Sequence, residues 1–153
     1  MKILHCVLFY AVLGIVFFGI GRLLAKLSFS YEKFPFKCYD FENEGLIYKK
    51  LGVHRWQNRV PDMSRLCRNI MPAKKFSSRP DKKTVCIMIN ETCVAELIHM
   101  LLCIFGLGVL WIWPGWGGAA VWIIYVLCNL PDVVIQRYNR PRLIKLMAVC
   151  RDD

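Results

Sequence analysis

Two ionisable side chains, Glu96 and His99, stand inside an apolar run of the chain and are the residues best suited to catalysis. Three positions apart, they share one face of a helix and can reach each other. A neutral imidazole can take the proton of a hydroxyl, while a neighbouring carboxylate fixes its tautomer and stabilises the imidazolium. Ionisable groups are costly inside a membrane span, so their presence indicates a functional site. The pair therefore suggests acyl transfer to a hydroxyl, with His99 as the general base.

A second polar cluster lies at and beyond the end of the last apolar run and includes Asn129, Arg137, Asn139 and Arg140. Guanidinium and amide groups can bind a developing oxyanion or the phosphates of a carrier such as coenzyme A. These residues are therefore candidate donor-binding groups. On spacing alone a structural alternative stays open, in which the carboxylate of the first cluster pairs with Arg137 and the imidazole bonds to a neighbouring helix.

An uncharged turn, Trp113–Gly118, separates the two apolar runs that carry these clusters. If both runs are helices, antiparallel pairing around the turn places His99 level with residues 129–130. Pro131 should kink the second of these helices and free a backbone carbonyl there. We therefore expect both clusters to form one polar pocket at the inner edge of a bilayer.

The composition of the 153 residues restricts the class of protein: 56% are hydrophobic, yet the net charge is +10. A soluble basic protein of this length is rarely so apolar, and a disordered one never is. A water-soluble enzyme and a nucleic-acid binder are therefore both disfavoured. The length suits one domain, which we place at 1–153.

Three runs, at about 3–21, 94–113 and 116–135, are long enough to cross a hydrocarbon core of about 30 Å as helices. The last two form a hairpin around the turn. We therefore predict an all-α integral membrane protein with about three transmembrane helices and further cytoplasmic or interfacial amphipathic helices. The first run is followed by Arg22 and Lys26 rather than by a small-residue cleavage site, which favours a retained anchor over a removed signal peptide.

The basic residues predict the orientation. Segment 22–90 holds 15 of the 21 Lys and Arg residues and the tail 137–153 holds 5, whereas the hairpin turn holds none. Because Lys and Arg stay on the cytoplasmic side, we expect a multi-pass protein of the cell membrane with the segment and the tail in the cytoplasm and the N-terminus outside. Trp111, Trp113 and Trp116 then suit the outer interface.

Aromatic and basic residues are mixed in the first part of the cytoplasmic segment. A short helix is predicted over residues 45–51, bordered by Lys49, Lys50, Arg55 and Arg59. The simpler interpretation is an interfacial helix among anionic headgroups, and the alternative is a binding surface for an acidic or phosphorylated lipid-like substrate. Another helix should begin near residues 82–85 and continue into the second span.

Metal and thiol chemistry have weaker support. The eight cysteines form neither a Cys-x-x-Cys pair nor a zinc spacing, and Glu96 with His99 lacks a clear third ligand. No paired carboxylates suited to Mg²⁺ and a diphosphate occur, which disfavours a polyprenyl transferase. We therefore expect no bound metal. Cys93, at the start of a span, offers a covalent variant in which its thiol carries the acyl group.

Three stretches of the sequence carry a family resemblance. They are Glu91–His99, with Glu-Leu-Ile-His at its end; Gln136–Leu143, with Arg-Tyr-Asn-Arg-Pro-Arg-Leu; and the central Tyr48–Asp62. In this order and spacing, with Asn129-Leu130-Pro131 between the first two, they resemble the bacterial glycosyl-4,4'-diaponeurosporenoate acyltransferase family. Its members are small membrane enzymes that put a fatty acyl chain on a sugar hydroxyl during the biosynthesis of staphyloxanthin, a carotenoid.

The resemblance implies a set of site residues and substrates. The acyl donor would be acyl-coenzyme A or an acyl-carrier protein, no cofactor would be bound, and the acceptor would be a glycolipid or a lipid-linked sugar. Gln57, Val94 and Met100 depart from the family's usual residues, so the acceptor need not be a carotenoid glycoside. The candidate site residues are Glu96, His99, Asn129, Arg137, Tyr138, Asn139 and Arg140, together with Arg55 and Trp56 of the central stretch.

Two questions about the protein as a whole stay open. Three spans are few to enclose an amphiphile, which favours a homo-oligomer or a further re-entrant helix. The alternative function is a non-catalytic membrane subunit or lipid-binding protein, in which Glu96, His99 and Arg137 form a buried structural network.

Overall fold

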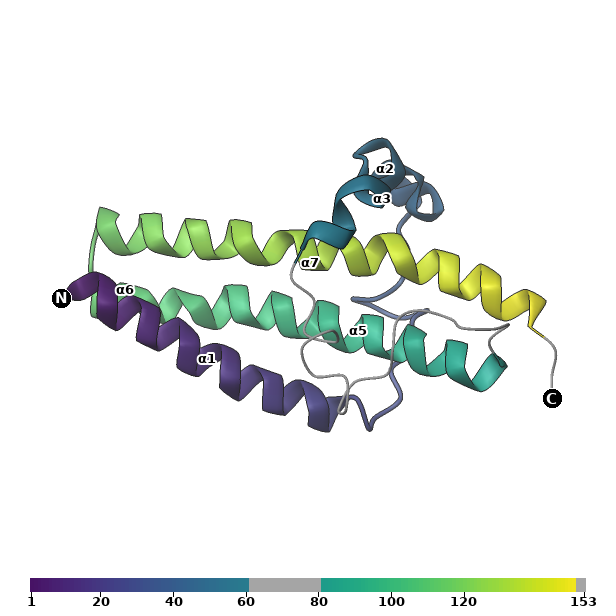
Figure 1. The fold of residues 1–153 in the computed structure, drawn as a ribbon, viewed down its shortest axis with the longest axis horizontal. Coiled ribbons are helices and arrows are strands. Elements are labelled where there is room, and N and C mark those ends of the chain that lie inside the picture. Colours follow the sequence, from purple (N-terminus) through teal and green to yellow (C-terminus); the bar gives the residue numbers. More distant parts are fainter. Residues whose placement is uncertain (61–80, 151–153) are drawn as a thin grey trace. The chain divides into compact units, whose positions relative to one another are not determined.

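The computed structural model describes residues 1–60 and 81–150 (Figure 1). This described part of the chain is helical and has no strand, which confirms the all-α class. Its three long helices are α1 (Lys2–Leu24), α5 (Lys82–Phe105) and α7 (Trp116–Val149). The shorter elements are η1 (Asp40–Gly45), α2 (Leu46–Lys50), α3 (Val53–Trp56), η2 (Gln57–Arg59), η3 (Gly106–Gly108) and α6 (Val109–Ile112).

Three stretches are long and apolar enough to cross a membrane: α1, Lys82–Ile112 and α7. Their number confirms the prediction. The helix that carries the second apolar run begins at Lys82, as predicted for residues 82–85, and α7 continues beyond the third run to Val149. Helix α7 stays helical through both Pro131 and Pro141. Much of the predicted basic tail is therefore helix.

The chain forms two compact units, of which the first comprises Met1–Ser28 and Val94–Val133. Within it α1 packs against α6. The rings of Tyr10 and Tyr125 stack with centroids 3.8 Å apart, and the Tyr10 hydroxyl donates a 3.3 Å hydrogen bond to the Gly106 carbonyl. A Cβ at Gly108 would lie 2.8 Å from the tip of the Phe9 ring, so glycine permits this close approach.

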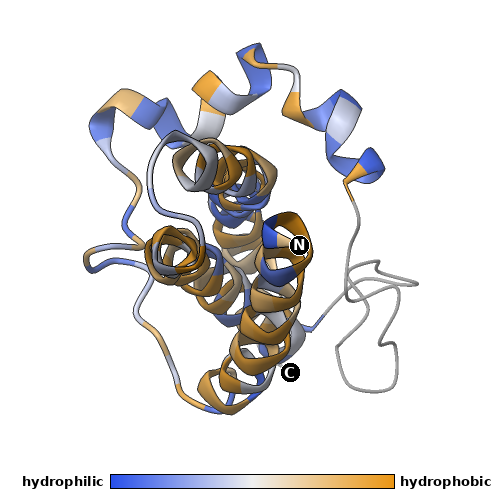
Figure 2. Ribbon diagram, turned by 90° about the vertical axis from the view of Figure 1, so that its left-hand side faces the viewer, coloured by the Kyte–Doolittle hydropathy of each residue, from blue (hydrophilic) through white to orange (hydrophobic). Residues whose placement is uncertain are grey.

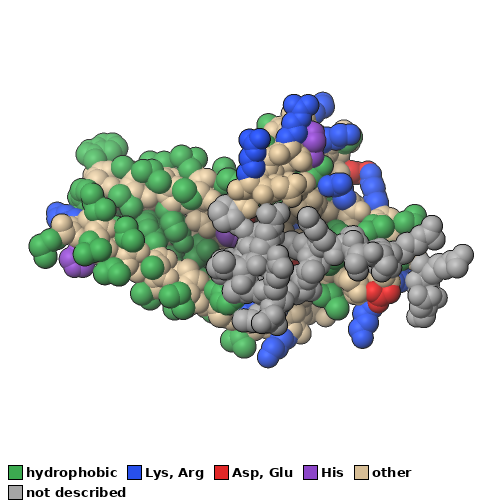
Figure 3. All heavy atoms as spheres, in the orientation of Figure 1, with side chains coloured by type: hydrophobic (Ala, Val, Ile, Leu, Met, Phe, Trp, Pro, Cys, Tyr) green, Lys and Arg blue, Asp and Glu red, His purple; other side chains and the backbone are tan. Residues whose placement is uncertain are grey.

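Most of the first unit's outer surface is apolar. Large side chains of α1 are well exposed, among them Ile3, Leu4 and Ile15 at 65%, 61% and 73%. Figure 2 shows α1 coloured hydrophobic along nearly its whole length, and Figure 3 shows hydrophobic side chains over it. Such a surface is unfavourable in water and favourable against lipid tails, as expected for a spanning helix.

The second unit comprises Phe29–Cys93 and Val134–Asp153, with residues 61–80 outside the described part. Its core is made by Tyr48, Val53 and Tyr138, with Trp56, Val134 and Ile135 packed against them. Lys and Arg side chains gather over α2 and α3 (Figure 3), as predicted for the basic helix near residues 45–51. The prediction of a single domain over 1–153 stays a prediction.

Candidate active site

In the first unit His99 of α5 faces α7. Its Nδ1 lies 2.9 Å from Oδ1 of Asn129 and 4.0 Å from Oδ2 of Asp132. About a quarter of the His99 side chain is exposed, so a substrate can reach it. Antiparallel pairing around the turn predicts that His99 lies level with residues 129–130. The contact with Asn129 confirms this register of the hairpin. Asp132 belongs to the second polar cluster of the sequence but was not among the candidate site residues.

The amide of Asn129 sets the tautomer of His99. Its Nδ2 donates a 2.9 Å hydrogen bond to the Tyr125 carbonyl, which can only accept. This orientation turns Oδ1 toward the imidazole, so Nδ1 must carry the proton and donate. In a neutral ring Nε2 then holds the lone pair, and among the described residues it has no hydrogen-bond partner. Such an imidazole is prepared to accept a proton.

Glu96 lies one turn before His99 on α5 but does not occupy the predicted position. Its side chain is fully buried, at 0% exposure, whereas Nδ1 of the imidazole lies next to Asn129 and Asp132. The position at Nδ1 that the sequence assigned to Glu96 is therefore taken by Asn129. The i, i+3 spacing allows Glu96 to contact His99, but it does not determine whether the partner of His99 lies on the same helix or on the neighbouring one.

In the second unit Arg137 pairs with Glu42, a residue that sequence reasoning missed. Arg137 Nη1 donates a 2.8 Å hydrogen bond to Glu42 Oε1, and Nη2 donates one of 2.7 Å to the Pro35 carbonyl. The guanidinium also lies 5.2 Å from the centre of the Tyr39 ring. Arg137 is thus held in place by at least three groups of the segment 35–42.

Glu42 collects hydrogen bonds from several directions and is only 2% exposed. Its Oε2 accepts one of 2.7 Å from the Tyr39 backbone N–H, and its Oε1 accepts one from the Tyr48 hydroxyl. Burial alone raises the pKa of Glu42, but these bonds and Arg137 outweigh it and hold the pKa below the usual carboxyl range. Burial, and then the Glu42 carboxylate, raise the pKa of Tyr48. The carboxylate therefore stays charged and the phenol neutral.

The local backbone brings Glu42 inward. Asn43, Glu44 and Gly45 all have positive φ, at 45°, 52° and 86°, so the chain turns sharply after Glu42. Within the polar run of residues 40–44 the sequence has one weak signal, a glutamate three positions after Tyr39 that can bond back to the preceding backbone N–H. With Tyr rather than Ser or Thr at the first position, that pattern is not specific.

Arg140 is almost completely buried, at 3% exposure, and joins two segments of the second unit. Its Nε and Nη2 donate hydrogen bonds of 3.0 and 3.1 Å to the hydroxyl and carbonyl of Thr92, and Nη1 donates one of 2.7 Å to the Phe36 carbonyl. These contacts give Arg140 a role in holding the unit together.

The remaining predicted residues also lie in the second unit. Tyr138 is buried in the core, beside Trp56, whose Nε1 donates to the Leu51 carbonyl at 3.3 Å. Asn139 Nδ2 donates a 3.2 Å hydrogen bond to Gln57 Oε1. Arg55 is exposed on α3. The structure thus places Tyr138, Trp56 and Asn139 in contacts between α7 and the segment 48–57, and their predicted role in substrate binding stays a prediction.

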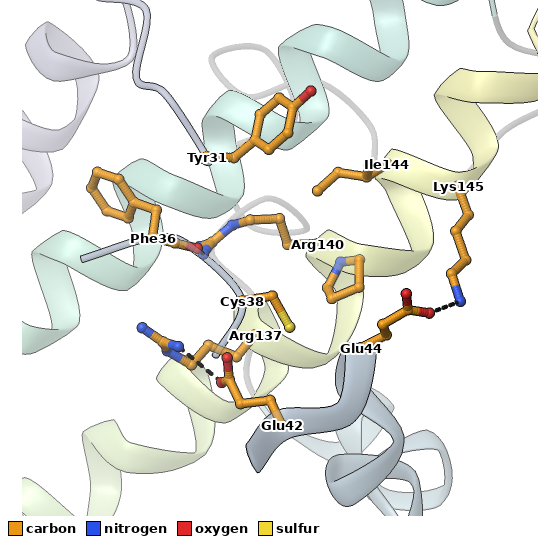
Figure 4. A pocket seen from close by; sticks show the side chains of 10 residues that line it. Tyr31, Phe36, Cys38, Glu42, Glu44, Arg137, Arg140, Ile144 and Lys145 are labelled. Atoms are coloured by element: carbon orange, nitrogen blue, oxygen red, sulfur yellow. Dashed lines mark hydrogen bonds and ion pairs between the residues drawn. The ribbon is translucent and has the colours of Figure 1, made fainter. Parts of the chain in front are cut away.

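A cavity of about 240 Å³, which we name the α7 cavity, opens in this unit beside the Glu42–Arg137 pair (Figure 4). Lys145 at its edge forms a 2.6 Å ion pair with Glu44, with both side chains about two-thirds exposed. Across residues 1–60 and 81–150 no group of three potential metal ligands is brought together. The cavity is lined by Tyr31, Phe36, Cys38, Glu42, Glu44, Arg137, Arg140, Pro141, Ile144 and Lys145.

Comparison with known families shows which family the chain belongs to. Residues 30–149 match the family described as glycosyl-4,4'-diaponeurosporenoate acyltransferase. The chain belongs to this family. The resemblance carried by the Glu-Leu-Ile-His and Arg-Tyr-Asn-Arg-Pro-Arg-Leu motifs is thereby confirmed, and the chain is a member of a family of acyltransferases.

Individual relatives are similar along most of their length. Proteins named glycosyl-4,4'-diaponeurosporenoate acyltransferase from Staphylococcus aureus strains bovine RF122 / ET3-1 and MRSA252 are each 27% identical over 152 residues, which cover 95% of this chain and 88% of the relative. The protein of that name from strain USA300 is 26% identical over the same coverage. No solved structure matches the chain.

Proposed function

We propose that the protein is a membrane acyltransferase that moves a fatty acyl group from a thioester donor to a hydroxyl of a glycolipid or lipid-linked sugar. The observation that carries the proposal is the hydrogen bond from His99 Nδ1 to Asn129, because it leaves Nε2 as the proton acceptor. The description of the family, glycosyl-4,4'-diaponeurosporenoate acyltransferase, supports the type of reaction and an acceptor that bears a sugar.

The reaction proceeds with His99 as general base. As the acceptor oxygen attacks the thioester carbonyl, its proton moves to Nε2. Asp132, 4.0 Å from Nδ1, stabilises the imidazolium that forms. The carbon–sulfur bond then breaks, the thiolate leaves, and the proton on Nε2 passes to it. The ester is formed and the neutral imidazole is restored.

Glu96 remains part of the proposal in a changed role. A fully buried carboxylate three residues from the base on α5 can contribute to the electrostatic environment of the imidazolium. The Asn129 amide performs the orienting role at Nδ1 that we had expected of Glu96. The donor-binding role falls to the second unit, in which Arg137 contributes to the wall of the α7 cavity.

The protein would work as a multi-pass protein of the cell membrane, with the N-terminus outside and the segment 22–90 and the C-terminus in the cytoplasm. The distribution of Lys and Arg supports this orientation. The side chains of Trp111 and Trp116, 90% and 92% exposed, lie beside and within the uncharged turn, where an outer interface would receive them. The acyl donor would be acyl-coenzyme A or an acyl-carrier protein, and a homo-oligomer would supply further walls around the lipid.

Substitution of His99 tests the proposal. His99→Ala should remove the acylated lipid product while the abundance of the protein in the membrane stays normal, with a loss of about 10²- to 10⁴-fold in turnover. The matched control is His54→Ala, because His54 is an exposed histidine on α3 outside the site. Lipids of a deletion strain complemented with each variant supply the readout.

Loss of membrane abundance in His99→Ala together with loss of product would support the non-catalytic alternative, a subunit or lipid-binding protein with a structural polar network. Normal product in the presence of His99→Ala would overturn the proposed base. The lipid that disappears in the deletion strain identifies the acceptor in the same experiment.

A further inference from the structure

The α7 cavity belongs to the second unit and contains none of the groups that take part in proton transfer. Its volume of about 240 Å³ is below the roughly 300–1,000 Å³ typical of sites for drug-sized ligands. It therefore suits a slender arm rather than a whole glycolipid. Figure 4 shows side chains from the segment 31–44 and from α7 facing one another around it.

The walls combine apolar and polar groups. Phe36, Pro141, Ile144 and the ring of Tyr31 offer apolar surface. The charged lining residues are three cations and two carboxylates, so the cavity favours an anion. The required ligand is thus flexible, partly apolar, able to form hydrogen bonds, and negatively charged at one end.

The α7 cavity has a buried ion pair in its deep wall and an exposed ion pair at its edge, and the two pairs differ in how firmly they are held. The Glu42–Arg137 pair is largely buried, with side chains 2% and 15% exposed, and each partner has further hydrogen bonds. Lys145 and Glu44 form an exposed pair, 66% and 68% accessible. Because exposed pairs contribute little, the Lys145 ammonium can turn from Glu44 to an incoming phosphate at little expense. The edge is therefore the place where an anion binds.

We propose that the α7 cavity binds the phosphopantetheine arm of the acyl donor, with the phosphate at Lys145 and the arm along Phe36 and Ile144. The arm alternates methylene groups and amides, carries a dimethyl group and ends in a phosphate, which suits apolar walls with a cation at the edge. This inference rests on the proposed function, because a thioester donor has to be bound. Coenzyme A and a carrier protein share the same arm, so the cavity suits either source.

Cys38 gives the cavity a chemical reporter. Its thiol lines the cavity and its side chain is exposed, so a maleimide can reach it and a bound arm can shield it. Burial raises the pKa of Cys38, and the nearby Glu42 carboxylate raises it further. The thiol is therefore protonated and does not compete for the acyl group. Cys86 is also exposed but lies on α5 outside the lining, and it is the internal control.

The test measures alkylation of both thiols in the full-length protein in detergent, by peptide mass spectrometry at pH 8. S-Hexadecyl-coenzyme A, a thioether with no free thiol, and a carrier protein bearing the S-hexadecyl arm are the two donor probes. We expect at least one of them to slow Cys38 alkylation while Cys86 is unaffected, and the effective probe identifies the source. S-Hexadecyl-pantetheine, which lacks the phosphate, should protect roughly tenfold more weakly, the value of one charge-assisted hydrogen bond.

Two variants sharpen the result. Lys145→Gln should weaken protection by S-hexadecyl-coenzyme A roughly tenfold. Arg142→Gln removes an exposed cation of the same helix that stacks on Tyr138 outside the cavity, and it should leave protection unchanged. Unchanged Cys86 alkylation in both variants reports an intact fold. No protection of Cys38 by either donor probe, or equal protection by phosphatidylglycerol vesicles, would overturn the assignment.

The same assay separates this inference from the proposed base. His99→Ala should lose acyl transfer but keep donor protection of Cys38. If His99→Ala loses acyl transfer but the donor probes do not protect Cys38 in the parent protein, the cavity assignment alone is rejected. If the probes protect Cys38 but His99→Ala transfers the acyl group normally, the base alone is rejected.

Discussion

The amide oxygen of Asn129 lies 2.9 Å from Nδ1 of His99, and the same amide donates to the Tyr125 carbonyl one turn earlier on α7. The backbone of one helix thus fixes an amide that fixes the tautomer of a histidine on another. A hydrogen bond of this kind restricts both the ring orientation and the location of its proton.

Asn129→Leu should lower turnover roughly ten- to hundredfold, because the lost hydrogen bond is worth about 1–3 kcal/mol and the ring can then adopt the other tautomer. The Michaelis constant for the donor should change little, since the amide orients the base. Cys128→Ala, at the exposed neighbouring position on α7, is the control. Steady-state kinetics with an acyl donor provide the measurement, and an effect confined to the donor's Michaelis constant contradicts the assignment.

Cys93→Ala should retain activity within about threefold, because the thiol is completely buried, and reactive thiols are typically accessible and surrounded by positive charge. The covalent variant of the mechanism makes the opposite prediction. Mass spectrometry of the protein after mixing with donor alone would reveal an added acyl group on this residue. A stable acyl adduct that disappears in Cys93→Ala refutes His99 as the direct activator of the acceptor.

Glu42→Gln should destabilise the protein by about 3 kcal/mol, because it leaves the largely buried Arg137 without its carboxylate. Arg137→Met should be similarly damaging, and the double variant should lose less than the sum of the two. Glu44→Gln, which breaks the exposed pair with Lys145, should leave the thermal midpoint unchanged. Thermal unfolding in detergent measures the stability of these four variants. Strictly additive losses in the double variant would contradict an interaction between Glu42 and Arg137.

Stability should fall in acid more steeply for the parent protein than for Glu42→Gln. The folded pKa of Glu42 is below its unfolded value, ordinarily about 4.3. The folded state therefore binds fewer protons between these two values, so its stabilisation is present above pH 4.3 and is lost as pH falls through the folded pKa. Midpoints measured between pH 7 and pH 3.5 test this, and parallel curves for the two proteins contradict it.

Gly108→Ala should destabilise the packing of α1, because the new methyl group would come within 2.8 Å of the Phe9 ring. Overpacking of this kind costs about 1–3 kcal/mol. Gly14→Ala adds the same methyl group on α1 where no atom lies within 4 Å, and it should be neutral or stabilising. Thermal midpoints of the two variants form a matched comparison, and equal midpoints refute the packing argument.

Much of the fold follows from local pattern. The three apolar helices, the start of α5 near Lys82 and the level of His99 with Asn129 were all predicted, because span length and antiparallel register depend on hydrophobic runs and a short turn. The end of α7 at Val149 was not, because its last turns contact residues distant in sequence, such as Lys145 with Glu44 and Met147 with Cys86, rather than continuing the apolar run.

The candidate site also has features that follow from local sequence and features that depend on the tertiary structure. Sequence alone determined that His99 sits level with Asn129 and that the chain bears the motifs of an acyltransferase family, since motifs and register are written in neighbouring residues. Only the tertiary structure decided that Arg137 meets Glu42, 95 residues away, and that Asn129 rather than Glu96 holds Nδ1. The physical reason is that sequence spacing alone allows a polar side chain to contact several different partners. The path of the backbone, here a turn of positive φ after Glu42, selects the one that it meets.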